Sequence, residues 1–452
     1  MIATREIAAS LGSMLRERRG PDARFQRVVV DSRKVGRGDL FVALPGERTD
    51  GHRFAIDAIE RGARGVLVSE LPEGLPSEAA AFVVGDPLAA LQRLAAGRRE
   101  RRRARVIGVT GSVGKTTTKE ITAAVLSTRY EVLKNEANYN NEIGLPLTVL
   151  ELTARHERAV LEMGMYSQGE IRTLCEIAKP QVGVVTNVGP AHLERLGSLE
   201  AIAAAKAELP ESLPAHGFAV FNADDPLVMT MVERTKAQPV TYGTAQGADT
   251  RATDIQSKGL EGVSFLLHWQ GATSRAETKL PGRHIVSNAL AAAAVALTDG
   301  MTLMDVTSAL AQAEPPLRVR THRASGGATI IDDVYNAGPA SMAAALDLLA
   351  EIPGRRIAVL GDMRELGPTE REEHRAVGRR AAETADVIHA VGDLGELIAE
   401  AARAEGHRDT HHWPTKEAAG EAVAADLRAD DVVLVKASRA MEFETLVDAL
   451  KD

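Results

Sequence analysis

Cysteine is almost absent from this chain of 452 residues, in which Cys175 is the single thiol. One cysteine excludes an intramolecular disulfide, and this scarcity is typical of proteins in a reducing compartment. Aromatic residues make up only 3% of the chain, while the hydrophobic fraction of 44% is ordinary for a globular protein. We therefore expect a folded, cytoplasmic protein with cores built from aliphatic side chains.

Long apolar runs and a surplus of positive charge are also missing. The longest apolar stretch covers residues 289–297, far short of the roughly 20 residues of a membrane helix, and no signal peptide is visible. The formal net charge of −8 argues against a dedicated nucleic-acid binder. The basic run at residues 98–103 fits an RNA-binding patch, but the simpler interpretation is a solvated helix end and linker, since no aromatics interrupt it.

The order of strand-like and helix-like segments indicates several α/β domains. At this length one core is not sufficient, and strands that alternate with helices predict parallel sheets covered on both faces. We predict three domains at residues 1–104, 105–314 and 315–452, with a hinge near Pro315 and Pro316. The expected strands are residues 27–30, 40–44, 65–68, 81–84, 106–109, 159–161, 182–185, 218–221, 330–331, 357–360, 387–391 and 432–435.

A glycine-rich loop, T-G-S-V-G-K-T-T at residues 110–117, lies between an expected strand and an expected helix at residues 117–126. Walker loops read G-x-x-x-x-G-K-[ST], but here Val109 occupies the place of the first glycine. The physical requirements remain, because small residues let backbone N–H groups converge on phosphate oxygens and the lysine neutralises charge. A glycine turn with an incidental lysine is the alternative. The predicted ATP contacts are Gly111, Ser112, Val113, Gly114, Lys115, Thr116 and Thr117.

The local sequence does not decide the roles of three further side chains. Glu162 follows a predicted strand, where it is either an Mg²⁺ ligand or an ordinary carboxylate at a strand end. His192 is either a ligand or a capping or core histidine. Lys206, taken alone, is best interpreted as a lysine on the surface of a helix.

Taken together, the motifs resemble the Mur ligase family of peptidoglycan synthesis over essentially the whole chain. D-S-R at 31–33, G-D-L-F-V-A-L-P-G at 38–46 and D-G-H at 50–52 resemble the uridine-nucleotide-binding domain of its two last-acting members. N-Y-N-N-E-I-G at 138–144, L-G-D-M-R-E-L-G at 360–367 and K-A-S-R-A-M at 436–441 are similar to motifs of the member that adds D-alanyl-D-alanine. L-E-M-G at 161–164 and D-D-V-Y-N-A at 332–337 also resemble family motifs.

The resemblance implies an architecture and a reaction. The N-terminal α/β domain would bind the UDP substrate, the central domain would be a P-loop ATPase with a parallel sheet, and the C-terminal domain would be Rossmann-like. The substrates would be UDP-N-acetylmuramoyl-tripeptide and D-alanyl-D-alanine, joined through an acyl phosphate by a monomeric, cytoplasmic enzyme. The alternatives are the family member that adds diaminopimelate or lysine, and a P-loop ATPase or nucleotide-responsive binding module.

The resemblance also implies roles for individual residues. Lys115, Lys206, His192 and Arg318 would be catalytic, and two Mg²⁺ ions would be bound by Thr116, Glu162, His192 and a carbamylated Lys206. Beyond the phosphate loop, the nucleotide would contact Asn288, Asp333, Tyr335 and Asn336. The remaining substrates would contact Ser32, Arg33, Gly46, Asn138, Asn140, Asn141, Lys436, Ser438 and Arg439. The chain departs from the family pattern at Ile285, Val334, Gly338 and Ala437, and none of these departures removes a charged group.

Overall fold

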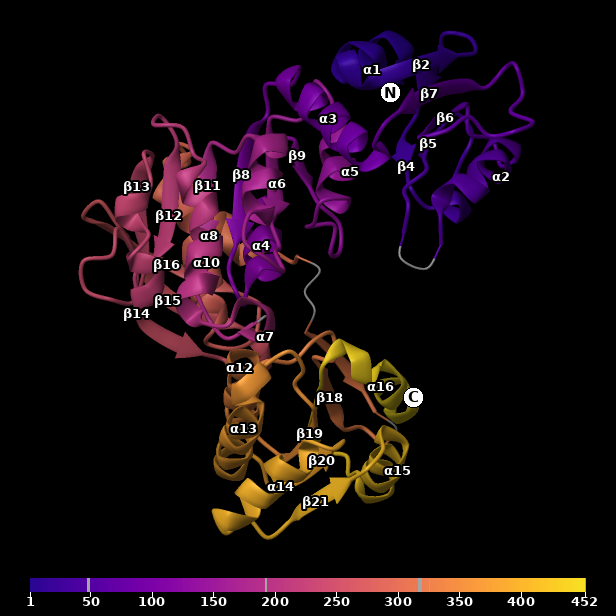
Figure 1. Cartoon of the computed structure of the whole chain (residues 1–452). Coiled ribbons are helices and arrows are strands. Elements are labelled where there is room, and N and C mark those ends of the chain that lie inside the picture. The colour runs from indigo at the N-terminus through magenta and orange to yellow at the C-terminus, as the bar shows by residue number, and fades with distance from the viewer. Residues whose placement is uncertain (47–48, 192, 316–318, 325, 452) are drawn as a thin grey trace.

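The computed structural model describes residues 1–46, 49–191, 193–315, 319–324 and 326–451. Three residues singled out above, His192, Pro316 and Arg318, lie outside these ranges. The described chain forms an N-terminal, a central and a C-terminal body in sequence order (Figure 1). Each body is a sheet covered by helices, so the predicted α/β class is confirmed. Within these ranges no helix is long and apolar enough to cross a membrane.

The N-terminal sheet has the strand order β2-β7-β6-β5-β4 and is parallel except for the pair β2 and β7. One face packs on α1 (Thr4–Leu11) and α3 (Pro87–Glu100), and the other packs on α2 (Ala55–Glu60). A separate antiparallel pair joins β1 (Ile2–Ala3) to β3 (Arg24–Phe25). The sheet strands are β2 (Leu15–Arg19), β4 (Val28–Val29), β5 (Leu40–Val42), β6 (Gly65–Val68) and β7 (Ala80–Val84).

The central sheet has the order β16-β15-β14-β13-β12-β11-β8-β10-β9. It is parallel from β9 to β14, and β15 and β16 extend it as antiparallel strands. The strands are β8 (Arg105–Thr110), β9 (Val132–Lys134), β10 (Arg158–Glu162), β11 (Val182–Val185), β12 (Phe218–Asn222), β13 (Gln238–Gly243), β14 (Thr250–Ser257), β15 (Val263–Trp269) and β16 (Ala272–Thr278).

Helices cover both faces of the central sheet. One face packs on α4 (Lys115–Ser127), α10 (Ile285–Thr298) and α11 (Leu303–Gln312). Helix α10 is apolar all round and almost wholly buried, as expected for a helix inside a core. The other face carries α5 (Gly144–Leu150), α6 (Glu170–Ala178), α7 (Leu193–Leu196), α8 (Leu199–Glu211) and α9 (Pro226–Met229).

The C-terminal sheet has the order β17-β18-β22-β19-β20-β21 and is parallel except for β17 against β18. Alternate residues of its strands point to opposite faces. One face packs on α12 (Pro339–Ala350), α13 (Glu370–Thr384) and α14 (Gly395–Ala404), and the other on α15 (Lys416–Asp426) and α16 (Glu444–Leu450). The strands are β17 (Arg320–Arg323), β18 (Thr329–Asp332), β19 (Arg355–Gly361), β20 (Val387–Val391), β21 (Thr410–Trp413) and β22 (Asp431–Lys436).

Short 3₁₀ helices lie in the connections. They are η1 (Gly12–Met14), η2 (Ser32–Lys34), η3 (Gly51–Phe54), η4 (Val232–Arg234), η5 (Gly259–Glu261), η6 (Gly367–Thr369) and η7 (Arg439–Met441).

The basic run at residues 98–103 corrects one interpretation of the sequence. Arg98 and Arg99 are only 3% and 5% exposed, so the solvated helix end proposed for this run is wrong at these positions. The Arg99 guanidinium donates to the carbonyl oxygens of Ala178 (2.7 Å) and Lys179 (3.3 Å). These carbonyls end helix α6, where unpaired oxygens and the negative end of the helix dipole attract a cation. The run therefore holds α3 against the central body.

Candidate active site

The phosphate loop follows β8 and leads directly into α4. Gly111 and Gly114 have φ values of +146° and +83°, conformations that favour glycine. A Cβ atom at Gly111 would lie 1.9 Å from Oγ1 of Thr186, and one at Gly114 would lie 2.7 Å from Nδ2 of Asn288. Both glycines are therefore required by close packing around the loop. The loop ends at the N-terminus of α4, where the backbone N–H groups and the positive end of the helix dipole favour phosphate binding.

Two polar side chains, one in the loop and one packed against it, already have partners. Nζ of Lys115 donates to the carbonyl oxygens of Gly111 (2.8 Å) and Ser112 (3.1 Å). Nδ2 of Asn288, in α10, donates to Oγ1 of Thr118 (2.9 Å) and to the carbonyl of Gly114 (3.3 Å). The lysine charge thus lies within the loop, and Asn288 links the loop to α10. The loop residue Thr117 is half-buried in the first turn of α4.

The segment after β11 holds the phosphate loop from the neighbouring strand. Oδ1 of Asn187 accepts from the Val113 N–H (2.8 Å), and Oγ1 of Thr186 donates to the Val113 carbonyl (2.7 Å). Oγ of Ser112 donates to the carbonyl of Gly189 (3.0 Å). Sequence reasoning missed Thr186 and Asn187. Their signal is a polar pair directly after a buried strand, but only the strand order shows that this strand lies beside β8.

Thr116 and Glu162, both predicted as metal ligands, lie together beside the phosphate loop. Oγ1 of Thr116 donates to Oε2 of Glu162 at 2.7 Å. Nδ2 of Asn140 donates to the other carboxylate oxygen, Oε1, at the same distance. Glu162 ends β10, which pairs with β8, and it is 1% exposed. Each carboxylate oxygen of Glu162 therefore has a hydrogen-bond donor.

The chemistry of these donors fits Mg²⁺, which prefers oxygen ligands and usually keeps bound water and substrate phosphates. Glu162 supplies a carboxylate and Thr116 a hydroxyl, both within reach of the phosphate loop. In the described part of the chain, no group of three or more His, Cys, Asp or Glu side chains could hold a metal ion without other ligands. An Mg²⁺ ion at Glu162 and Thr116 would take its further ligands from phosphate and water oxygens.

Lys206 is buried in α8 with 2% exposure, so the surface lysine expected from its sequence context is wrong. Burial, followed by the positive charge of Lys115, lowers the pKa of Lys206 well below its usual value. Both influences act in the same direction, because low polarity and a neighbouring cation each disfavour the ammonium form. The amine at this position therefore favours its neutral form.

The asparagine loop at residues 138–141 makes contacts with three parts of the structure. Asn140 binds Glu162 as described, and Oδ1 of Asn141 accepts from the Gly144 N–H at 2.9 Å, at the start of α5. The side chain of Asn138 is exposed. Lys34 of η2 approaches this loop, with Nζ 3.5 Å from the Tyr139 hydroxyl. The N-terminal body and the asparagine loop therefore meet at this edge of the central sheet.

The residues predicted to bind substrate in the N-terminal body are in short loops. Ser32 is buried in η2, while the guanidinium of Arg33 pairs with Asp31 at 2.9 Å. The Gly46 N–H donates to the Thr49 carbonyl at 3.2 Å. These contacts give the local geometry of the predicted residues and leave their contact with substrate a prediction.

In the C-terminal body, the predicted residues cluster at the carboxyl ends of β18 and β22. Nζ of Lys436 lies 2.6 Å from Oδ2 of Asp333 and donates to the Asn336 carbonyl (2.9 Å). Lys436 thus holds the segment after β18 in place. Oγ of Ser438 accepts from the Arg364 N–H at 2.9 Å, which joins the two motifs at 360–367 and 436–441.

The Arg439 guanidinium pairs with Glu444 and lies 5.7 Å from the ring centroid of Tyr335. Tyr335, predicted to contact the nucleotide, and Arg439, predicted to contact substrate, therefore lie close together at this edge. Sequence reasoning missed His284, which precedes α10 in the central body. Burial lowers its pKa, and of the nearby charges Asp333 raises and Lys436 lowers it. His284 therefore lies near the carboxyl ends of β18 and β22.

Family comparisons follow the same three bodies. The model of the Mur ligase family catalytic domain matches residues 24–99, the Mur ligase middle domain matches residues 109–296, and the Mur ligase glutamate ligase domain matches residues 317–439. The chain belongs to the Mur ligase family. The predicted family assignment is thereby confirmed.

Mur ligases with defined names resemble the chain over nearly its full length. UDP-N-acetylmuramoyl-tripeptide–D-alanyl-D-alanine ligase from Synechocystis is 41% identical over 95% of this chain and 92% of its own length. The ligase of the same name from Bacillus subtilis is 39% identical over 94% and 92%. The crystal structure of MurF from Acinetobacter baumannii has a TM-score of 0.89 and 33% identity, covering 99% of this chain and 98% of that one. MurF from Thermotoga maritima in complex with ADP has a TM-score of 0.82 and 31% identity, covering 94% and 96%.

Proposed function

We propose that this Mur ligase joins D-alanyl-D-alanine to UDP-N-acetylmuramoyl-tripeptide at the expense of ATP. The observation that carries the proposal is that three features lie together at one edge of the central sheet. They are the phosphate loop, the pair of Thr116 hydroxyl and Glu162 carboxylate, and the buried Lys206. Relatives about 40% identical over nearly the whole chain are named for this reaction, and one similar structure holds ADP. The products are UDP-N-acetylmuramoyl-pentapeptide, ADP and phosphate.

The reaction requires two transfers, because a carboxylate does not react with an amine in water without activation. A carboxylate oxygen of the tripeptide attacks the γ-phosphorus of ATP, and the bond to ADP breaks. The amine of D-alanyl-D-alanine then attacks the acyl carbon, phosphate leaves and the nitrogen loses a proton. Lys115 and the N–H groups at the start of α4 stabilise the charge on the transferred phosphoryl group. Positioning of the two substrates supplies much of the remaining rate.

Two sites for Mg²⁺ follow from the same residues. Thr116 and Glu162 would hold one ion beside the phosphates, where its charge offsets that of the transferred group. Lys206 would take part in a second site with His192 after carbamylation, since CO₂ converts a neutral amine into an anionic oxygen ligand. The burial of Lys206 and its lowered pKa support this role, because only the neutral amine can react with CO₂. A free ammonium at this position would repel the metal.

The remaining predicted residues divide between the bodies. The domain at residues 1–104 would bind the UDP substrate, and the domain at residues 105–314 would bind ATP. The domain at residues 315–452 would contact the ATP from the side opposite the phosphate loop. Arg318 would contact the transferred phosphoryl group, and closure about the segment at Pro315 and Pro316 would bring the bodies together. The UDP substrate would contact Ser32, Arg33 and Gly46. The nucleotide would contact Asn288, Asp333, Tyr335 and Asn336. The substrates would also contact Asn138, Asn140, Asn141, Lys436, Ser438 and Arg439.

The decisive experiment measures phosphate release with ATP, Mg²⁺ and UDP-N-acetylmuramoyl-tripeptide. D-alanyl-D-alanine, diaminopimelate and L-lysine are compared as amines, and the UDP-muramoyl-dipeptide is tested in parallel. Release that requires the tripeptide and D-alanyl-D-alanine supports the proposal. Release with the dipeptide and one diamino acid would move the protein to the preceding ligation. Release without dependence on any amine would leave an ATPase and overturn the ligase assignment.

A further inference from the structure

Strand β9 leaves the central sheet just before the asparagine loop, and one buried side chain replaces its next hydrogen bonds. The ladder between β9 and β10 ends at Lys134, opposite Val160. Asn135 follows with no exposed surface. Its Oδ1 accepts from the Glu162 N–H at 2.9 Å, and its Nδ2 donates to the Glu162 carbonyl at 3.1 Å. The side chain thus satisfies both backbone groups of Glu162, as a paired strand would.

The same amide of Asn135 also reaches the asparagine loop. Its Nδ2 donates to the Tyr139 carbonyl at 2.8 Å. Tyr139 directly precedes Asn140, which donates to Oε1 of Glu162. Asn135 therefore holds the backbone of Glu162 in position. Through the Tyr139 carbonyl it also positions Asn140, one of the two residues that orient the Glu162 carboxylate.

A buried lysine connects this arrangement to the phosphate loop. Lys119 has no exposed surface, and its Nζ donates to the Asn135 carbonyl at 2.7 Å. Lys119 is one turn along α4 from Lys115 and Thr116, and Thr116 donates to the second oxygen of Glu162. The Nζ atom also pairs with Glu120 at 3.0 Å, so its charge is balanced inside the protein. Helix α4 thus fixes Glu162 directly through Thr116 and indirectly through Lys119 and Asn135.

We propose that Asn135 and Lys119 are positioning residues that hold Glu162 in the geometry needed to bind a divalent cation. This inference rests on the proposed function, in which Glu162 is an Mg²⁺ ligand. Groups that orient a metal ligand affect binding strongly, and their loss typically weakens metal affinity or activity by about 10- to 100-fold. A purely structural role would lower stability and leave the affinity for the cation unchanged.

Two substitutions test the proposal at different points of the network. Asn135→Leu keeps a similar side-chain volume and removes the three hydrogen bonds of the amide. Lys119→Met keeps the unbranched stem and removes the bond from Nζ to Asn135, while Glu120 retains its ion pair with Lys134. If Asn135→Leu does not fold, Lys119→Met still tests the connection.

Asp299→Asn is a matched control in the same sheet. Asp299 is buried and pairs with Arg105 (2.9 Å) and Arg158 (2.7 Å). These arginines begin β8 and β10, so the ion pairs lie at the opposite end of the strands from Glu162. The control therefore weakens the central body without altering the residues around the phosphate loop.

The full chain is saturated with ADP, and Mn²⁺ binding is measured by electron paramagnetic resonance of the free ion, with thermal unfolding in parallel. We expect Asn135→Leu and Lys119→Met to raise the Kd for Mn²⁺ by about 10-fold or more, and Asp299→Asn to lower only the Tm. Unchanged Mn²⁺ affinity in a folded Asn135→Leu or Lys119→Met variant, whatever its Tm, would overturn the proposal. Absence of Mn²⁺ binding by the unmodified protein would do the same.

The outcome is separate from that of the ligation assay. If the unmodified protein forms no amide bond but the two variants still lose Mn²⁺ affinity, the positioning role is supported and the proposed substrates are wrong. If ligation occurs and Mn²⁺ affinity does not change in the variants, the ligase assignment is supported and the positioning role is overturned.

Discussion

Acidification is expected to destabilise the C-terminal sheet through His389. This residue lies in β20, is 5% exposed, and its Nδ1 accepts a hydrogen bond from Nε1 of Trp413 at 2.9 Å. Its ring stacks against those of His411 and Trp413, with centroid distances of 5.2 and 6.1 Å, and the latter two rings lie 6.2 Å apart. Protonation would place a hydrogen on Nδ1 and remove the acceptor that Trp413 uses. Burial, and next the charge of His411, lowers the pKa of His389 to about 4.

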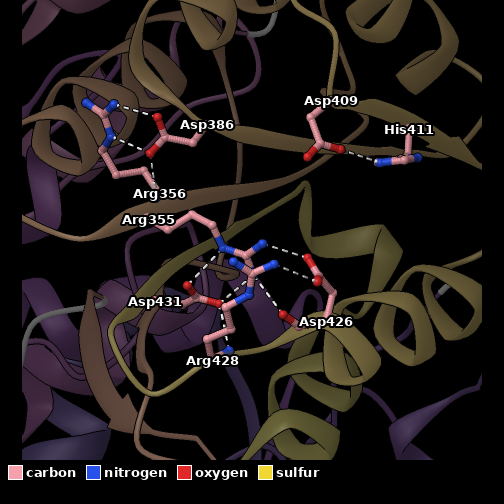
Figure 2. A network of polar contacts seen from close by, with 8 residues as sticks. All are labelled: Arg355, Arg356, Asp386, Asp409, His411, Asp426, Arg428 and Asp431. Carbon is pink, nitrogen blue, oxygen red and sulfur yellow. Dashed lines mark hydrogen bonds and ion pairs between the residues drawn. The ribbon is translucent and has the colours of Figure 1, made fainter.

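The surrounding charges do not reverse this direction. Figure 2 shows Arg355 between Asp426 and Asp431, and His411 beside Asp409. The ion pair between His411 and Asp409 has a distance of 2.7 Å. Asp409 and Asp426 raise the pKa of His389, but burial and His411 have larger effects, and Arg355 lowers it further. Arg355 is itself neutralised by two carboxylates. The neutral ring is therefore the form that the folded sheet favours.

The sign and size of the effect follow from linkage. The folded protein binds the proton at a pKa of about 4, whereas an unfolded histidine binds it near 6.5, so the unfolded state takes up more protons between these values. The contribution of His389 is fully present above about pH 6.5 and is lost as the pH falls toward 4. The loss amounts to about 2 kcal/mol at pH 5 and about 3 kcal/mol at pH 4.

Urea unfolding followed by tryptophan fluorescence measures this loss. Trp269 and Trp413 are the two tryptophans of the chain, so a Trp269→Phe background makes Trp413 report on the C-terminal sheet alone. His389→Asn is compared with this background at pH 7.5 and pH 5, because its amide oxygen can accept from Trp413 but does not titrate. Other groups titrate in both proteins, and their contributions cancel in the difference.

We expect the stability difference between the two proteins to change by about 2 kcal/mol from pH 7.5 to pH 5. His411→Asn should reduce this change, since it removes one of the causes of the lowered pKa. If the two proteins lose equal stability on acidification, His389 does not titrate with a lowered pKa and the reasoning fails.

Three further predictions concern the site and the attachment of α3. Lys115→Ala should abolish phosphate release and leave circular dichroism and Tm nearly unchanged; a rate near that of the unmodified protein would contradict the phosphate-loop assignment. Lys206→Ala should be inactive and regain part of its activity with millimolar formate or acetate, which can replace the carbamate oxygens; full activity without added acid would show that Lys206 has no part in catalysis. Arg99→Leu should lower the free energy of unfolding by about 3 kcal/mol, because it leaves buried carbonyls unpaired, whereas Arg103→Ala, at an exposed position, should change it by less than about 0.5 kcal/mol in urea titrations.

Most of the parallel strands could be predicted because each is a short apolar run bounded by polar residues. The strands at residues 65–68, 182–185 and 387–391 have the predicted limits, and the other expected strands differ by no more than two residues at either end. Strand β14 and the antiparallel extension of β15 and β16 were missed. Burial alternates along the first half of β14, and most of β16 is exposed or half-buried, so these two strands lack the continuous apolar runs of the parallel ones.

The burial of Arg98 and Arg99 in the basic run at residues 98–103 depends on tertiary structure. Arg98 and Arg99 have the sequence pattern of a solvated helix end, and nothing within the run indicates burial. Their partners are Glu6, some ninety residues earlier, and the carbonyls of Ala178 and Lys179, about eighty residues later. Local sequence cannot identify carbonyl partners, because every residue has one. The role of these arginines follows only from the packing of α3 on α6.

The phosphate loop and Glu162 were easier to predict from the sequence than the residues that orient them. The phosphate loop was identifiable because its glycines, lysine and threonine are contiguous, and Glu162 because it follows a buried strand. The residues that orient these groups are scattered. Thr186 and Asn187 are next to the loop only because β11 pairs with β8, and Asn135 is next to Glu162 only because β9 pairs with β10.

The position of Lys206 shows why one sequence feature can mislead. A lysine in an alanine-rich helix is normally exposed, and the local pattern favoured that interpretation. Helix α8 instead packs on the face of the sheet behind the phosphate loop, which buries Lys206 and brings it under the influence of the charge of Lys115. Desolvation and the charge of Lys115 both disfavour the charged amine at this position. The carbamylation proposed above would convert this amine into an anion, and the repulsion from Lys115 would then become attraction.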